Sequence, residues 1–240
     1  MRSFQILIGL VLVSGTGVVV GHGLGGTPEL TATSAGATPS QGSTQASGET
    51  LPKDIHPDTG NRLPAIKREA LDDTGKKLFD LRGPGRTFGP GGIRLYSPPV
   101  AAYMSGVNDY LQHKSRLDPR LQELAILVAA REMDCQYEWT NHEPMGLKAG
   151  LPQQTIDIVK YRKSPNELEE KEKVIIQLGR EAIGKHQVSS GTAARAQDLF
   201  GNQGLVNYVS LMCDYASTAI LLSVFDQHVH PTDKPLLPIP

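Results

Sequence analysis

The chain has 240 residues, of which 39% are hydrophobic and 20% charged, enough for a globular domain with a hydrophobic core. Its 24 basic and 25 acidic side chains give a net charge of -1, which argues against the basic surface that holds nucleic acid or an anionic membrane. The two cysteines, Cys135 and Cys213, are too few for a tetracysteine zinc site, an iron–sulfur cluster or a multi-disulfide scaffold.

Residues 1–23 have the pattern of a targeting segment. Arg2 supplies a positive charge, and a short apolar run follows over residues 6–13. The run is short and glycines interrupt its continuation, which does not favour a membrane span. No clear cleavage site of small residues follows, so a cleaved signal peptide and a retained N-terminal anchor both stay open. We expect an exported protein, periplasmic or extracellular.

Residues 24–60 form a predicted flexible linker. Between Leu24 and Thr50, 21 of 27 residues are Gly, Ser, Thr, Pro or Ala, and Glu29 and Glu49 are the only charged ones. Such a stretch cannot bury enough apolar surface to offset the entropy of the chain. We therefore expect a tether between the targeting segment and a folded domain.

Residues 61–240 are predicted to form an all-α helical domain, because apolar residues recur at helical spacing between Gly and Pro breaks and no strand-like alternation occurs. Before the first clear helix, the glycine-rich stretches 83–85 and 89–92 are expected to be loops, and a pocket lid is one role for them. The first helix, Pro99–His113, carries an apolar stripe of the kind that faces a core. The stripe consists of Val100, Tyr103, Met104, Val107 and Leu111.

The next predicted helix begins at Asp118-Pro119, where Asp caps a helix and Pro is favoured at its first position. It is apolar nearly all round up to Ala129, so we expect it to be buried, with Glu123 as its polar exception. A further helix is expected from about Cys135 to Gly150. Four more are predicted to start at Pro152, after Ser164-Pro165, at Thr192 up to Gly201, and at Leu205 up to Phe225, before an extended tail.

Reactive side chains gather between Glu123 and Glu143. Cys135, Glu138 and His142 are three and four residues apart, so on a helix their side chains share one face and can meet. Glu123 comes from the buried helix before them. A buried carboxylate is costly without a partner, and His142 or Cys135 is available.

This cluster suits proton transfer or thiolate chemistry. His142 between two carboxylates could act as a base near neutral pH. The thiol of a cysteine at a helix N-terminus has a lowered pKa, whereas buried carboxylates raise it. From residue types alone, a satisfied polar cluster in the core is an equally good interpretation.

The same stretch resembles the carboxymuconolactone decarboxylase and alkylhydroperoxidase D-like family. One branch has the motif Cys-x-Tyr-Glu-Trp-x-x-His, present here as Cys135, Tyr137, Glu138, Trp139 and His142. Glu123 matches a Glu that the family places in the preceding helix, and residues 88–101 are similar to the branch's upstream segment. The resemblance covers roughly residues 81–225. It implies an all-helical bundle of the alkylhydroperoxidase D-like type and a homo-oligomer, commonly a trimer or hexamer.

One departure from the family pattern bears on the activity. Hydroperoxidase members resemble Cys-x-x-Cys-x-x-x-His, in which the second cysteine resolves the oxidised first one. Here Cys135 and His142 match, but Glu138 stands at the second cysteine position. Peroxidase activity would therefore need Cys213 or an external thiol. We expect Cys213, which lies among apolar residues of a helix, to be an inert core thiol.

Decarboxylase members of the family act on small carboxylated lactones, which implies a proton donor and acceptor; Glu123, Glu138 and His142 would supply them. A substrate carboxylate needs a cation, and Arg can grip it with two hydrogen bonds. Candidate arginines are Arg82, Arg86, Arg94 and Arg131. The predicted substrate-binding residues are Tyr137, Trp139, Arg94 and Arg131.

The leading hypothesis is an exported, oligomeric, cofactor-free enzyme. It would carry out acid–base chemistry, a decarboxylation or a related lyase or hydrolase step, on a small carboxylated or lactone-type molecule. A thiol-dependent peroxidase using Cys135 and a non-catalytic oligomeric module are the alternatives.

No metal site is expected, because His228 and His230 lack the spacing and third ligand of a defined site. The predicted partners are a small-molecule substrate and further copies of the chain, with a membrane tether only through the N-terminal segment.

Overall fold

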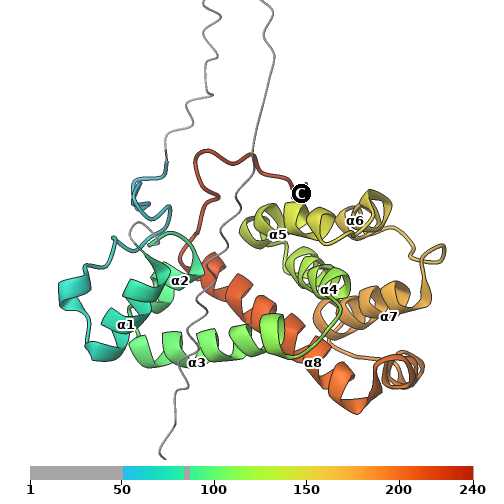
Figure 1. Ribbon diagram of the computed structural model, residues 1–240. Helices are drawn as coiled ribbons and strands as arrows, with labels where there is room; N and C mark the ends of the chain where they lie inside the picture. The colour runs from blue at the N-terminus through green and yellow to red at the C-terminus, as the bar shows by residue number, and fades with distance from the viewer. Residues whose placement is uncertain (1–50, 84–86, 240) are drawn as a thin grey trace, which may run out of the picture. The chain divides into compact units, whose positions relative to one another are not determined.

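The computed structural model describes residues 51–83 and 87–239 (Figure 1). The predicted targeting segment 1–23, residues 24–50 of the predicted linker, and Arg86 lie outside the described residues. Within those residues the chain forms eight α-helices and no β-strand, with one isolated antiparallel bridge between His56 and Asn61. The prediction of an all-α fold is confirmed.

The helices divide into two groups along the chain. The first group is α1 (Asp73–Arg82), α2 (Pro90–Arg94) and α3 (Pro98–Asp109), which continues into a π-helical turn at Tyr110–Lys114. The second is α4 (Pro119–Glu132), α5 (Gln136–Lys148), α6 (Gln153–Lys160), α7 (Glu170–Gly179), a π-helical turn at Arg180–Gly184, and α8 (Ser190–Val224). In Figure 1, α4 lies among α5, α6, α7 and α8, whereas α1 and α2 lie beside α3.

Helix α4 is the centre of the core. The Asp118 side chain accepts hydrogen bonds from the backbone N–H groups of Arg120 and Leu121, and Pro119 occupies the first turn, so the helix begins where the sequence predicts. Its residues from Leu124 to Ala130 are at most 1% exposed. A helix that is apolar on all sides must be covered on all sides, and α5, α6, α7 and α8 provide the cover.

Helix α8 packs against the core and against one side of α3. The prediction of two helices on either side of Gly201 is confirmed, because this residue interrupts α8 with a φ of 65° and a ψ of 174°, which are not helical. By length and composition α8 is apolar enough to cross a membrane, but half of its most apolar window is buried inside the protein. The helix therefore contributes directly to the core, through residues such as Leu211 and Met212.

Two expectations for residues 89–107 are wrong. Gly89 does lie in a loop, but residues 90–92 do not, because Pro90 begins α2, and Gly92 lies so close to Thr87 that an added Cβ would be 1.8 Å from its carbonyl oxygen. The apolar stripe of α3 does not face the core along its length. Val100, Tyr103 and Val107 are 49%, 72% and 45% exposed, because the residues that bond to α8 here, Asn108 and Gln112, lie off the stripe.

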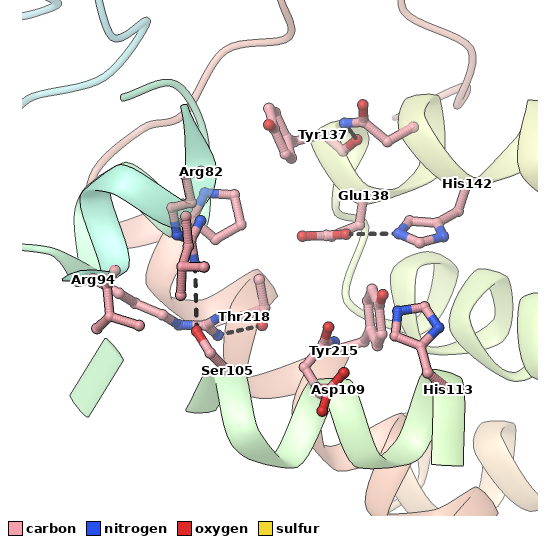
Figure 2. A pocket seen from close by; sticks show the side chains of 16 residues that line it. Arg82, Arg94, Ser105, Asp109, His113, Tyr137, Glu138, His142, Tyr215 and Thr218 are labelled. Atoms are coloured by element: carbon pink, nitrogen blue, oxygen red, sulfur yellow. Dashed lines mark hydrogen bonds and ion pairs between the residues drawn. The ribbon is translucent and has the colours of Figure 1, made fainter. Parts of the chain in front are cut away.

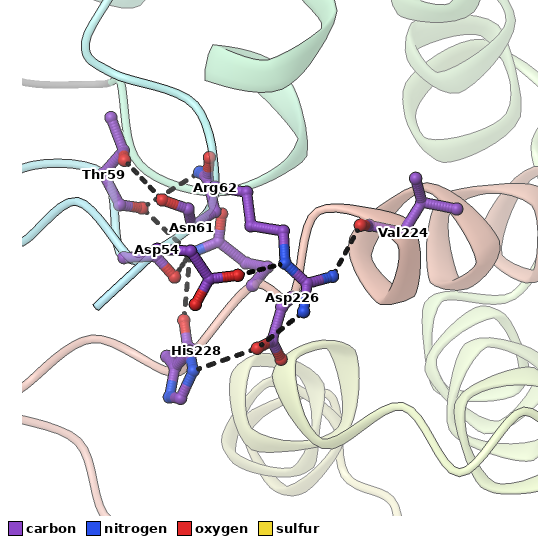
Figure 3. Close-up of polar contacts among 9 residues, drawn as sticks. Asp54, Thr59, Asn61, Arg62, Val224, Asp226 and His228 are labelled. Atoms are coloured by element: carbon purple, nitrogen blue, oxygen red, sulfur yellow. Dashed lines mark hydrogen bonds and ion pairs between the residues drawn. The ribbon is translucent and has the colours of Figure 1, made fainter. Parts of the chain in front are cut away.

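The segment before α1 packs on the end of α8, including residues 54–60, which the sequence assigns to the linker. Arg62 binds Asp54, the carbonyl oxygen of Val224 and Asp226 (Figure 3). The Asn61 side chain, 1% exposed, donates to Gln227 at 2.8 Å. These contacts fix the chain around residues 59–62 against the residues that follow α8.

Candidate active site

Glu123 of α4 and Glu138 and His142 of α5 form a continuous chain of ionisable side chains. His142 Nδ1 lies 2.9 Å from Glu123 Oε2, and His142 Nε2 lies 3.5 Å from Glu138 Oε2. Glu138 and His142 are one helical turn apart on α5, which gives them a common face. The expectation that buried Glu123 needs a partner is confirmed, and the partner is His142 rather than Cys135.

The two carboxylates determine the charge of His142. Burial by itself lowers the pKa of the imidazole, but the hydrogen bonds and negative charges of Glu123 and Glu138 outweigh it and raise the pKa to about 9. The imidazole is therefore protonated at neutral pH. This corrects the expectation that His142 could act as a base there: in the resting protein it is a proton donor.

Glu138 and His142 open onto a cavity of about 640 Å³ between α1, α2, α3, α5 and α8. The cavity is large enough for a small organic molecule. Its other polar lining residues are Arg82, Arg94, Ser105, Asn108, Asp109, His113, Tyr137, Asn141, Tyr215 and Thr218.

Two guanidinium groups lie across the cavity from the Glu138–His142 pair (Figure 2). Arg94 Nη2 donates to Thr218 Oγ1 at 2.6 Å, and Thr218 in turn donates to the Asp214 carbonyl oxygen at 2.8 Å, which holds Arg94 in place. Arg82 Nη2 lies 3.4 Å from Ser105 Oγ. The cavity thus has an acid–base pair on one wall and two cations on the other.

All three members of the ionisable chain lie in the part of the sequence that a family model recognises. Residues 98–160, from α3 to the end of α6, match the model described as the carboxymuconolactone decarboxylase family. The match covers about a quarter of the chain, and over these residues the chain is similar to this family. Comparison with curated proteins and with solved structures gave no match.

Cys135, which lies within the matched residues and directly precedes α5, does not join Glu138 and His142. It caps the helix with an extended backbone (φ -85°, ψ 95°), so its side chain leaves the face that the spacing predicts. The thiol packs against Ile93, Ala219 and Leu222 and lines a separate cavity of about 210 Å³. Burial raises the pKa of the thiol to about 12, and the charge of Glu138 adds to this. The predicted convergence of thiol, carboxylate and imidazole is therefore wrong for the thiol.

Cys213 also departs from expectation. Both cysteines carry free thiols, and Cys213 is exposed on α8 rather than buried in the core. Cys213 was predicted to be buried because its neighbours in the sequence are apolar. On the helix, however, Leu211 and Met212 face inward and Cys213 lies on the outer face.

Two predicted substrate-binding residues lie away from the large cavity. Trp139 is 0% exposed in the core. Its indole N–H donates to Glu143, which also binds Lys160 at 2.8 Å. Arg131 is 7% exposed and donates to Asp134 and to the carbonyl oxygen of Pro238. Both residues hold the fold together, since Trp139 points from α5 into the core and Arg131 ties down the C-terminal tail.

Tyr137 and Arg94, the other two predicted substrate-binding residues, do line the cavity. Sequence reasoning missed Tyr215, Thr218 and Asn108. A signal for Thr218 was present, because Asp214 and Thr218 interrupt an apolar helix at a spacing of four, which puts a polar strip along one side of α8. In the residues that the structure describes, no three or more His, Cys, Asp or Glu side chains are grouped as a metal site would need.

Proposed function

We propose that this protein is an acid–base enzyme that acts on a small molecule bearing a carboxylate, with decarboxylation as the reaction. One observation carries the proposal: the Glu123–His142–Glu138 chain reaches a cavity of about 640 Å³ whose opposite wall holds Arg82 and Arg94. The family description points to the same class of reaction. Among the cavity-lining side chains, two guanidinium groups and an imidazolium outnumber the carboxylates of Glu138 and Asp109, which favours an anionic substrate.

The proposed reaction needs one proton. As the bond between the substrate carbon and its carboxylate breaks, CO₂ leaves and the electron pair stays on the carbon, delocalised onto a neighbouring carbonyl oxygen. The His142 imidazolium then gives its Nε2 proton to the carbon. Glu123 and Glu138 keep the imidazole charged beforehand, and solvent returns the proton afterwards.

The test is a screen of small carboxylated lactones and unsaturated keto acids for release of CO₂. We expect turnover by the wild type and a loss of about 10²- to 10⁴-fold in kcat for Glu138→Gln and His142→Gln. Glu167→Gln, an exposed carboxylate outside the site, serves as the control and should match the wild type. Full activity of both site variants, or no CO₂ from any compound, would contradict the proposal.

The thiol peroxidase alternative has less support. Cys135 is buried, its thiol has a pKa raised to about 12, and it lies on a different cavity from His142. A peroxidatic cysteine is instead a reachable thiolate. If peroxide is consumed in the presence of a thiol reductant, and Cys135→Ser abolishes this, the alternative replaces the decarboxylase proposal.

The non-catalytic alternative makes the site a stabilising network. It predicts that Glu138→Gln and His142→Gln lower the melting temperature strongly, with no turnover to lose. The acid–base proposal predicts loss of activity in variants that still fold.

We also propose that copies of this chain associate through the exposed side of α3. Tyr96, Val100, Tyr103, Val107 and Tyr110 follow one another at helical spacing there and are 42–72% exposed. Such apolar patches are uncommon on monomers. Light scattering should give an oligomer for the wild type and a smaller species for Tyr103→Glu; a monomeric wild type would contradict the proposal.

Export remains a proposal that rests on residues 1–23 alone. Fractionation of cells that make the full chain tests it, and recovery with the cytosolic proteins would contradict it.

A further inference from the structure

A row of hydrogen-bonded side chains connects α8 with α3 and then returns to α8, where it ends at the cavity. Asn108 Nδ2 donates to Asp214 Oδ2 at 3.0 Å, and Asn108 Oδ1 accepts from Gln112 Nε2 at 3.2 Å. Gln112 Nε2 also donates to the hydroxyl oxygen of Tyr215, at 2.6 Å. The row therefore ends on a phenol whose side chain lines the cavity.

The carboxylate of Asp214 accepts at one end of the row, and this determines which group donates in each of the other hydrogen bonds. Because the Asn108 amide nitrogen donates to Asp214, its oxygen must accept, and Gln112 must present its NH₂ group. One hydrogen of that group goes to Asn108 and the other to Tyr215. The Tyr215 oxygen is thus an acceptor toward Gln112, and its own hydrogen is available to a molecule in the cavity.

Tyr215 lies next to the acid–base pair. Its ring meets the His142 ring edge-on, with the centroids 5.0 Å apart and the planes at 89°, and Figure 2 shows it on the same wall below Glu138. A ligand in contact with the imidazole is therefore within reach of the phenol. Burial and the nearby carboxylates, Glu138 first, raise the pKa of Tyr215, so the hydroxyl keeps its proton at all ordinary pH values.

We infer that Tyr215 is a further catalytic residue, whose hydroxyl donates a hydrogen bond to the substrate oxygen on which negative charge develops. Gln112 and Asn108 are its positioning residues. The inference rests on the proposed function, since a developing enolate is what acid–base chemistry next to a carbonyl produces. A preorganised donor at that oxygen is among the strongest contributions to such reactions.

The experiment uses a stable analogue, the tetronate anion, a five-membered lactone that carries an enolate at neutral pH. Its affinity is measured by calorimetry at pH 7.5 for wild type and Tyr215→Phe, with the uncharged lactone 2(5H)-furanone as a ligand control. We expect the Phe variant to bind tetronate about 10- to 100-fold more weakly, as loss of a hydrogen bond to a charged oxygen requires. The affinity for the uncharged lactone should stay unchanged.

The matched protein control is Tyr208→Phe, which removes a buried phenol from the same helix at a residue outside this cavity. It should bind tetronate as the wild type does. Gln112→Leu should weaken tetronate binding by a smaller factor than Tyr215→Phe, and a circular dichroism spectrum equal to that of the wild type shows that each variant is folded.

The outcomes separate this inference from the proposed function. Equal tetronate affinity for the wild type and Tyr215→Phe, or no binding to the wild type, overturns the donor role whatever the lactone screen gives. A selective loss of tetronate affinity without CO₂ release from any compound supports the donor role and contradicts decarboxylation.

Discussion

Gly89 lies directly beneath the hydroxyl of Tyr137. A Cβ atom at Gly89 would be 2.1 Å from the Tyr137 oxygen, and the backbone there has a φ of 78°, a value that residues with a side chain rarely adopt. The residue therefore lets the loop before α2 close against α5, and it places Tyr137 at the edge of the cavity.

Gly89→Ala should destabilise the protein through both strain and contact. Gly83 is the matched control, because its φ is 77° and an added Cβ meets nothing within 4 Å. We expect Gly83→Ala to cost about 1 kcal/mol from backbone strain alone. Gly89→Ala should cost about 1–3 kcal/mol more, from the displaced Tyr137. Urea denaturation measures both, and equal losses would show that the Tyr137 contact is unimportant.

Lys160 neutralises a carboxylate inside the core. Its ammonium group lies 2.8 Å from Glu143, which is 7% exposed and also accepts the Trp139 N–H. Lys160→Met removes the charge but keeps the apolar stem, and should cost about 3–5 kcal/mol, since it leaves Glu143 buried without a partner.

Fluorescence of Trp139, the only tryptophan of the chain, follows unfolding in this experiment. Lys163→Met, which alters an exposed lysine of the same segment, is the control and should change stability by less than about 0.5 kcal/mol. Similar losses for the two variants would mean that the buried pair does not stabilise the core.

The two thiols should react at very different rates. Cys213 is exposed, whereas Cys135 is buried with a pKa raised to about 12, and only the thiolate attacks an aromatic disulfide reagent. At pH 8 we expect a fast phase that Cys213→Ser removes and a slow phase that Cys135→Ser removes. A fast phase that survives in Cys213→Ser would make Cys135 reactive and would revive the peroxidase alternative.

Stability should fall with rising pH because of His142. The pKa of His142 is raised from 6.5 to about 9 in the folded protein. Protonated His142 therefore contributes fully to the free energy of unfolding below pH 6.5, and this contribution is lost as the pH rises to about 9. The loss amounts to roughly 3 kcal/mol for the wild type. Glu123→Gln should flatten the slope between these pH values in urea titrations. An equal slope in the wild type and the variant would rule out this origin.

Much of the helical core follows from the sequence because local signals and burial agree there. Asp118-Pro119 marks the start of α4, Gly201 marks the bend of α8, and the apolar run of α4 demands complete cover. The exposed stripe of α3 could not be found this way. Periodicity tells which residues share a face, but it does not tell whether that face meets the core or the outside.

The candidate site was predictable where residues lie within one helix. Glu138 and His142 share a face by spacing alone, and Glu123 needed a partner for its charge. The helical spacing rule does not apply to Cys135, because this residue caps α5 and is not part of the helix. Tyr215 contacts His142, and Arg94 lines the same cavity, only through the tertiary packing of α8 and α2, which no sequence spacing encodes.

The protonation state of His142 tests the central claim most directly, because the proposed chemistry needs an imidazolium facing the cavity. Nitrogen NMR of the His142 ring, assigned with His142→Gln, measures its pKa in the wild type, Glu123→Gln and Glu138→Gln. The account predicts a protonated ring at pH 7.5 with a pKa near 9 in the wild type, and a lower pKa in each variant. A neutral His142 at pH 7.5 in the wild type would contradict it.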